Sequence, residues 1–274
     1  MYGRNDQLIQ LQDPATIDAV VTRIFESYPV HLVDERHTFY RIRLNPATPH
    51  EFAQYDSPPE GRGGGNRFDA PGLPVFYGSP DLELCIHECR VTVEDDLYVA
   101  KLAPARPLKL LNLAAWMQEE ENNEFTSLDL ALHFLFSAGK QAYTICRHLA
   151  ERAKAEGFDG LIFPSYFSYI RTGYTPFDTI LGMSIRRIKQ LEQLIQAQIV
   201  PNIALFGRPV AEGTVSVQTI KKVVLNSIRY DLTFGPAYHG EKIDLHDKEA
   251  ILNQKLDAYA DRITKAFNTL PQGP

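Results

Sequence analysis

The stretch GLPVFYGSPDLELCIHECRV, residues 72–91, decides the fold because a short apolar strand runs almost directly into a helix. The segment GLPVFYG is predicted to form a buried strand containing Tyr77. Ser79 and Pro80 predict the start of the helix, with a capping hydroxyl followed by proline at the first helical position. The helix is expected to extend to about Val91.

One side of this predicted helix is apolar, and its buried stripe consists of Leu82, Cys85, Ile86 and Cys89. Glu88 lies about a quarter to a third of a turn to the side of that stripe, because successive helical residues are about 100° apart. The helix therefore places the carboxylate of Glu88 at the edge of the core.

Strands are predicted on both sides of this stretch. In HTFYRIRL, residues 37–44, alternation places Arg41 and Arg43 on one face with Phe39, and Tyr40, Ile42 and Leu44 on the other face. Apolar runs predict the other strands: DLYVAKL (96–102), PLKLLNL (107–113), FDGLIFPS (158–165), NIALFG (202–207), VSVQTIKKVVL (215–225) and RYDLTF (229–234). The strand FDGLIFPS leads into Ser165, where the chain leaves the sheet.

Helical periodicity predicts further helices at both ends and in the middle of the chain. They cover about Pro14–Tyr28, Ser127–Ser137, Tyr143–Glu156 and Lys248–Phe267, with Gly157 as the residue that ends the third of them. Another helix is predicted from the spacing of Ile185, Ile188, Leu191, Leu194 and Ile195. It lies in an insertion that would cover a pocket or a partner surface.

These elements predict an α+β fold with a compact mixed sheet and flanking helices. The expected organisation is an N-terminal helical extension over 1–36, a core over 37–210 with the helical insertion near 166–200, and a C-terminal extension over 211–274 that packs on the core. A chain of 274 residues suits one such unit with appendages.

The composition is that of a globular protein, with 44% hydrophobic and 23% charged residues. The net charge of −6 gives no general attraction to nucleic acid or to anionic lipid surfaces. The N-terminal segment lacks the apolar core of a signal peptide, and no apolar run is long enough to span a membrane. We therefore expect a cytoplasmic protein with no direct nucleic-acid or membrane partner.

The three cysteines, Cys85, Cys89 and Cys146, are an odd number and favour reduced thiols. A tetrahedral metal site that includes His148 is the alternative. Cys85 and Cys89 belong to the apolar stripe, where cysteine packs as a small hydrophobic residue. We therefore predict buried thiols and no metal site.

A glycine-rich loop precedes the Tyr77 strand and contains the cluster Gly61, Gly63, Gly64 and Gly65. Its backbone can approach a bulky ligand closely, although it matches neither a P-loop nor a dinucleotide-binding motif. Arg41, Arg62 and Arg67 around this loop carry paired N–H donors that suit a diphosphate. The sequence FPSYF around Ser165 is not a hydrolase nucleophile elbow.

Together these segments resemble the RES domain family, which is named for its Arg, Glu and Ser residues. The family motifs are matched by Tyr40-Arg41, the loop NRFDAPG (66–72), Tyr77-Gly78, Glu88 in IHECR, DGLIFPS (159–165) and NIALF (202–206). The resemblance covers about Thr38 to Phe206. The chain departs from the family at Asp69-Ala70, where Asn-Pro is usual, and in the insertion from about Tyr166 to Val200.

The resemblance implies a fold similar to the ADP-ribosyltransferase toxins, NAD as substrate rather than cofactor, and a role as the toxin of a bacterial toxin–antitoxin pair. The implied partner is a helix-turn-helix antitoxin, and a homo-oligomer is left open.

In this hypothesis Glu88 stabilises positive charge on the ribose as the nicotinamide–ribose bond breaks. Arg41 and Arg67 hold the diphosphate, and Gly65 permits close approach of the ligand. Tyr77 packs against nicotinamide or its ribose, and Ser165 hydrogen-bonds that ribose or the carboxamide.

The acceptor is left open by the sequence. Water or inorganic phosphate would make the protein an NAD glycohydrolase or phosphorylase, whereas a protein acceptor would make it a mono-ADP-ribosyltransferase. A module that binds NAD without cleaving it is a further alternative.

Overall fold

The computed structural model describes residues 14–59, 65–117, 132, 135–136, 142–168, 172–173, 179–180, 183–184 and 188–228. The chain divides into two units, Met1–Ile228 and Arg229–Pro274, and all described residues belong to the first. The predicted strand RYDLTF, the helix Lys248–Phe267 and most of the helix Ser127–Ser137 lie outside the described residues, as does Arg62.

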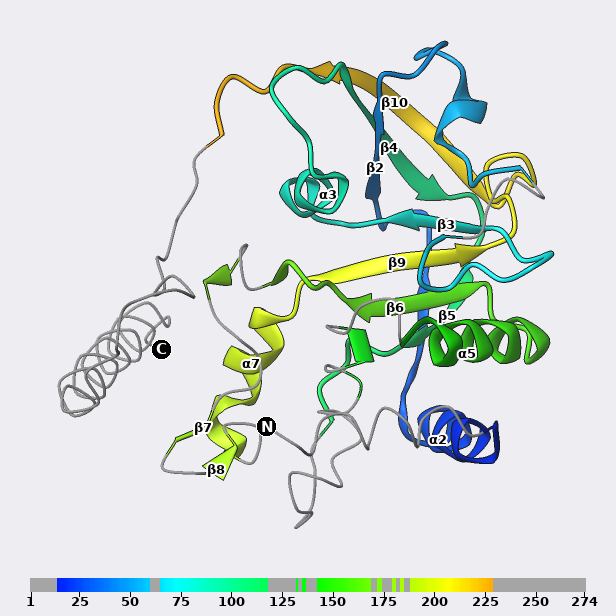
Figure 1. The fold of residues 1–274 in the computed structure, drawn as a ribbon, viewed down its shortest axis with the longest axis vertical. Helices are drawn as coiled ribbons and strands as arrows, with labels where there is room; N and C mark the ends of the chain where they lie inside the picture. The colour runs from blue at the N-terminus through cyan, green and yellow to red at the C-terminus, as the bar shows by residue number, and fades with distance from the viewer. Residues whose placement is uncertain are drawn as a thin grey trace, which may run out of the picture. The chain divides into compact units, whose positions relative to one another are not determined.

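A five-stranded mixed sheet forms the centre of this unit (Figure 1). Its strand order is β1 (Val30–Val33), β5 (Leu108–Asn112), β6 (Gly160–Pro164), β9 (Pro201–Phe206) and β3 (Val75–Gly78). Strands β5 and β6 run parallel, and the other neighbours run antiparallel. The α+β class and the mixed sheet are therefore confirmed.

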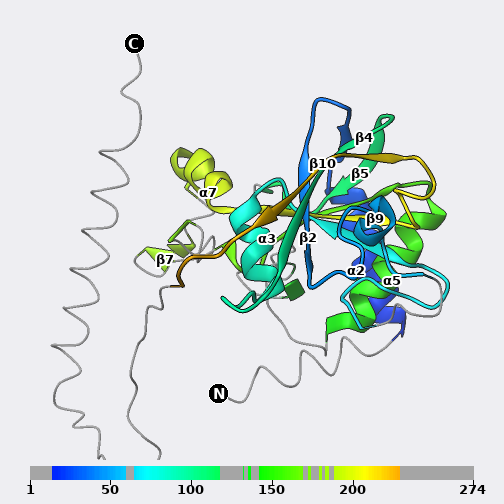
Figure 2. The same cartoon turned by 90° about the horizontal axis from the view of Figure 1, so that it is seen from above.

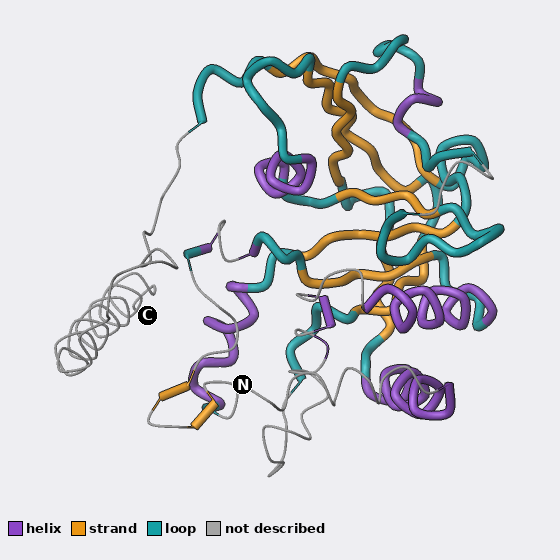
Figure 3. The backbone as a smooth tube through the Cα atoms, in the orientation of Figure 1, coloured by secondary structure: helices purple, strands orange, loops and turns teal. Residues whose placement is uncertain are grey.

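Three further strands form a smaller antiparallel sheet beside the first, as the tube drawing shows (Figure 3). Their order is β10 (Val215–Val223), β4 (Leu97–Pro104) and β2 (Phe39–Leu44). The short strands β7 (Thr179–Ile180) and β8 (Met183–Ser184) pair only with each other within the described residues.

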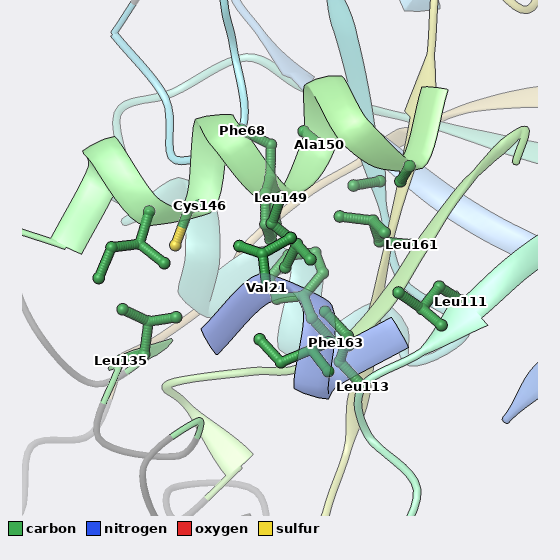
Figure 4. Packing of buried hydrophobic residues seen from close by; sticks show 14 of the residues in the cluster. Val21, Phe68, Leu111, Leu113, Leu135, Cys146, Leu149, Ala150, Leu161 and Phe163 are labelled. Atoms are coloured by element: carbon green, nitrogen blue, oxygen red, sulfur yellow. The ribbon is translucent and has the colours of Figure 1, made fainter. Parts of the chain in front are cut away.

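Two helices, α2 (Pro14–Ser27) and α5 (Tyr143–Ala155), pack on one face of the five-stranded sheet. Figure 4 shows Val21 of α2 close to Cys146 and Leu149 of α5 and to Leu161 of β6. The helix α5 ends at Ala155, one residue before the predicted end, and Gly157 beyond it has a φ of 78°. A left-handed residue of this kind commonly ends a helix.

A second apolar cluster joins the two sheets, with Phe39 and Leu102 of the smaller sheet against Leu110, Ile203 and other residues of the larger one. The opposite face of β2 carries Ile42, which packs with Cys85 of α3 (Leu82–Cys89). Figure 2 shows α3 alongside β2. The predicted division of the β2 side chains between two faces is confirmed.

The start of α3 differs from the prediction. Ser79 forms a bridge with Tyr40 of β2, so its backbone remains extended. Its hydroxyl donates to the carbonyl of Pro201 instead of capping the helix. Asp81 is the N-cap, because its carboxylate accepts the N–H of Leu84 at 2.9 Å.

The buried stripe of α3 also needs correction, because Leu84 and Cys85 are its buried residues, while Leu82, Ile86 and Cys89 are partly buried. The insertion helix begins later than predicted. A 3₁₀ turn, η4 (Lys189–Leu191), precedes α7 (Glu192–Gln198), in which Ile195 is buried. Ile185 lies outside the described residues. In the described part of the chain, the helices are too short or too polar to cross a membrane.

Candidate active site

The carboxylate of Glu88 is held at the end of α3 by two hydrogen bonds from other elements. The hydroxyl of Ser165 donates to Oε1 of Glu88 at 2.6 Å. The side-chain amide of Asn202 donates to the same oxygen at 2.7 Å. Within the described residues, Oε2 of Glu88 has no hydrogen-bond partner, and the side chain lines a cavity. Two hydrogen bonds thus fix one oxygen of a carboxylate that faces the cavity.

Ser165 follows β6, and its position is set by the neighbouring chain. Its backbone N–H donates to the carbonyl of Val200 at 3.0 Å, which extends the pairing of β6 with β9. Its hydroxyl oxygen accepts the N–H of Phe167 at 3.0 Å. The one O–H of Ser168 lies within hydrogen-bond distance of two carbonyl oxygens, 2.9 Å from that of Ser165 and 3.2 Å from that of Val200. The turn after β6 therefore fixes the hydroxyl that contacts Glu88.

Arg41 projects from β2 into the space between the two sheets, where it is only 6% exposed. Its guanidinium donates to the carbonyls of Tyr77 at 2.6 Å and Asp56 at 3.1 Å. It also lies 4.4 Å from the centre of the Phe76 ring, a cation–π contact. Burial lowers the pKa of Arg41 to about 9, and the charge of Arg43 acts in the same direction. Arg41 therefore keeps its charge at neutral pH.

Arg67 links the loop NRFDAPG to the residues before α5. Its guanidinium donates to the carbonyls of Leu135 and Phe136, each at 2.9 Å. It also approaches the ring of Tyr143, with 5.4 Å to the centroid. Arg67 therefore connects its loop to the residues before α5, and its charged group lies in the cavity wall.

Tyr77 uses its hydroxyl to hold the same loop. The hydroxyl accepts the N–H of Phe68 at 3.0 Å and donates to Asp69 Oδ1 at 3.1 Å. Asp69 also accepts a hydrogen bond from the amide of Asn66. Burial and the nearby Asp69 raise the pKa of Tyr77 well above its usual value. Asp69 is thus an acceptor within the loop.

The cavity between these elements has a volume of about 380 Å³, within the range of small-molecule sites. Its wall includes Arg41, Arg67, Tyr77 and Glu88, while Ser165 reaches the site through Glu88. Gly65 is exposed and is not part of the wall. The other lining residues are Tyr40, Ile42, Arg43, Asn66, Gly78, Cys85, Cys89, Phe136, Tyr143, Phe163, Pro164, Tyr166 and Asn202.

Sequence reasoning missed Asn202 and Arg43 as site residues. Asn202 begins the segment NIALF, and the available signal in the sequence was a polar residue at one end of an apolar strand. In the structure this residue is 7% exposed. Arg43 shares a face with Arg41, and its guanidinium donates to the carbonyls of Gln54 and Asp56. Both residues line the cavity.

The cysteines lie in different environments. Cys146 of α5 belongs to the core cluster between α5, α2 and the larger sheet, whereas Cys85 of α3 packs against Ile42 and other residues of the smaller sheet. Burial raises the pKa of Cys85 to about 12 and that of Cys146 to about 11. His148 lies 3.9 Å from Asp18 of α2. Among the described residues, no group of three or more His, Cys, Asp or Glu side chains is arranged to hold a metal ion.

The fold and the site define an α+β protein in which arginine, glutamate and serine from separate segments gather around one cavity. Residues 38–172 match the family model of the RES domain, and this region belongs to the RES domain family. No curated protein matches the chain.

Among solved structures, the chain is similar to one in the crystal structure of the M. tuberculosis MbcT–MbcA toxin–antitoxin complex. The sequence identity is 14%, and the TM-score is 0.43. The match covers 76% of this chain and 93% of the other.

Proposed function

We propose that the protein cleaves the nicotinamide–ribose bond of NAD and that Glu88 is the catalytic carboxylate. The observation that carries this proposal is the geometry of Glu88, with one oxygen bound by Ser165 and Asn202 and the side chain facing the cavity. Breaking the bond generates oxocarbenium character at the ribose, which a fixed carboxylate stabilises.

The arginines supply the charge that a dinucleotide requires. Arg41, Arg43 and Arg67 all line the cavity, and guanidinium groups suit the oxygens of a diphosphate. Arg41 and Arg67 are also tied to backbone carbonyls. Their positions are therefore set before any ligand enters, which reduces the cost of ordering them on binding.

Nicotinamide departs as a neutral group, so the reaction needs no strong general acid. The hydroxyl of Tyr77 is bound to the loop, and its pKa is raised well above the usual value. In this proposal Tyr77 offers its ring to nicotinamide or the attached ribose.

Nicotinamide release from NAD tests the proposal. We expect Glu88→Gln to lower kcat by roughly two to three orders of magnitude, the usual loss for one electrostatic contact in the transition state. Glu94→Gln is the matched control, because Glu94 is exposed, as Glu88 is, but does not line the cavity. Turnover of Glu88→Gln close to that of the wild type would overturn the role of Glu88.

Incubation of the protein with labelled NAD identifies the acceptor of the ADP-ribosyl group. Label on a polypeptide would identify ADP-ribosyl transfer, free ADP-ribose would identify hydrolysis, and its phosphate ester, formed only with added phosphate, would identify phosphorolysis. Binding of NAD without release of nicotinamide would identify a non-catalytic module. We favour a small-molecule acceptor, water or phosphate.

We further propose that the protein is the toxin of a toxin–antitoxin pair, which rests on membership of residues 38–172 in the RES domain family. Expression in bacteria should deplete NAD and stop growth, and a neighbouring helix-turn-helix antitoxin should restore growth. The Glu88→Gln variant is the control that separates loss of NAD from the burden of expression. Equal growth arrest by the variant would argue against NAD depletion as the cause.

A further inference from the structure

Asn202 is placed by a rigid part of the fold. It lies in β9 directly opposite Phe163 of β6, and its side chain is among the buried polar groups at 7% exposure. The two strands pair from Gly160 to Pro164, and the N–H of Ser165 continues the pairing to Val200. The amide of Asn202 and the hydroxyl of Ser165 therefore project from neighbouring positions of one sheet.

Both groups donate to the same oxygen of Glu88, which belongs to a different element, α3. A single donor would leave the carboxylate free to pivot about that contact. Two donors, one from β9 and one from the turn after β6, fix Oε1 and restrict the direction of Oε2. Groups held in this way by other side chains are pre-organised for the transition state.

Ser165 has no second proton to offer to a substrate. A serine hydroxyl has one donor, and this donor is given to Glu88. The oxygen also accepts the N–H of Phe167. The hydroxyl of Ser165 therefore acts on Glu88, as the amide of Asn202 does.

We propose that Asn202 is a positioning residue for the catalytic carboxylate, acting with Ser165 as a two-donor clamp on Oε1 of Glu88. The inference rests on the proposed function for its kinetic consequence, whereas the clamp itself is a structural claim. Asn202 fixes the position of the carboxylate that faces the cavity, and its loss lowers the rate through Glu88.

A double-mutant cycle in nicotinamide release tests the kinetic claim. We expect Asn202→Leu, which keeps the size of the side chain, to lower kcat by about 10- to 100-fold with KM within about threefold, because small misplacement of a reacting group is costly. In the Glu88→Gln background the same change should cost less than about threefold. Equal losses in the two backgrounds would overturn the role of Asn202.

Gln198→Leu is the matched control for removing a buried amide. Gln198 is 5% exposed at the end of α7 and does not line the cavity. Its substitution should leave kcat unchanged. A loss equal to that of Asn202→Leu would instead indicate a general effect on folding and would overturn the specific role.

A swap of donor and acceptor tests the clamp without activity. Asn202→Asp places a carboxylate against Glu88, and we expect Tm to fall by about 3–6 °C. Combined with Glu88→Gln, an amide again meets a carboxylate, and Tm should recover most of that loss. Additive losses would overturn the clamp.

The swap separates the two proposals. If the wild type releases no nicotinamide, the proposed function fails and recovery of Tm still supports the clamp. If the wild type is active but the swap shows no recovery, the inference fails and the proposed function stands.

Discussion

Arg41 shows how one residue can have two tasks at the scale of a side chain. Its guanidinium joins the carbonyl of Tyr77 in β3 to that of Asp56, and it lies over Phe76. Lysine carries a compact charge that cannot reproduce the planar fork of arginine. The charged residue in the cavity wall thus also joins β2 of the smaller sheet to β3 of the larger one.

We therefore predict that Arg41→Lys lowers stability as well as activity. Loss of one or both hydrogen bonds from a buried charged group should reduce the free energy of unfolding by about 2–3 kcal/mol. Urea unfolding measures this change. Arg36→Lys is the control, because Arg36 is exposed and, among the described residues, pairs only with nearby Asp34. An unchanged unfolding midpoint for Arg41→Lys would show that its buried contacts contribute little.

The order of motifs along the chain predicted which residue types gather at the site, and the cavity contains Arg41, Tyr77 and Glu88. The sequence could not indicate that the hydroxyl of Ser165 donates its one proton to Glu88, or that the amide of Asn202 donates to the same oxygen. Such contacts depend on how the tertiary fold brings Glu88 of α3 to the residue after β6 and to β9, which no local pattern encodes.

At the scale of the element, strands with a strong apolar pattern were predictable and weak ones were not. The strand β6 is buried along its whole length. In β1 only Val33 is buried, and Val30 and Leu32 are exposed, so its pattern gave no signal. The cap of α3 was misplaced because Ser79 is held in extended backbone by its bridge to β2.

Gly160 sets the spacing between β6 and β9. A Cβ at this position would lie 2.1 Å from the carbonyl oxygen of Ala204. We predict that Gly160→Ala lowers the free energy of unfolding by about 1–3 kcal/mol, because the strands must separate to admit the methyl group. Gly65→Ala is the control, since a Cβ there would meet no atom of the described residues within 4 Å beyond its own chain neighbours. Equal unfolding midpoints for the two variants would contradict this account.

Asp159, at the start of β6, should make part of the stability depend on pH. Burial opposes its charge, but hydrogen bonds from Arg106 and from the N–H of Lys109 outweigh burial and lower the pKa of Asp159 below 3.8. A depressed carboxyl pKa stabilises the folded protein above the unfolded pKa, and the stabilisation is lost as the pH falls through the folded pKa.

We therefore predict that the wild type is more stable than Asp159→Asn at pH 6 and that the difference decreases below pH 3.8. Urea unfolding of both proteins across this pH range measures the change. The substitution also weakens the hydrogen bonds that the carboxylate accepts. Only the part of the stability difference that varies with pH therefore reports the charge of Asp159. A difference independent of pH would contradict the assignment.

At the scale of the molecule, the site lies where separate layers meet. The smaller sheet supplies Arg41, α3 supplies Glu88, and the larger sheet supplies Asn202. The central strand β4 holds β2 on one side and β10 on the other. The cavity therefore depends on strands that do not line it, including β10 in the predicted C-terminal extension.

This dependence predicts different outcomes for two truncations. The described residues that line the cavity lie between Tyr40 and Asn202, and β10 ends at Val223. A chain that ends after Ile228 keeps every described contact of β10, and we expect it to unfold cooperatively and to release nicotinamide from NAD. A chain that ends after Val210 removes β10, which pairs with β4 along its length.

The shorter chain uncovers the edge of β4 and loses the N–H of Ala211 that donates to the buried Asp56. The lost hydrogen bond to a buried carboxylate and the open strand edge are both costly. We expect insoluble protein or loss of cooperative unfolding, measured by circular dichroism during heating. Cooperative unfolding and full activity in the shorter chain would show that the smaller sheet does not need β10 to hold Arg41 in place.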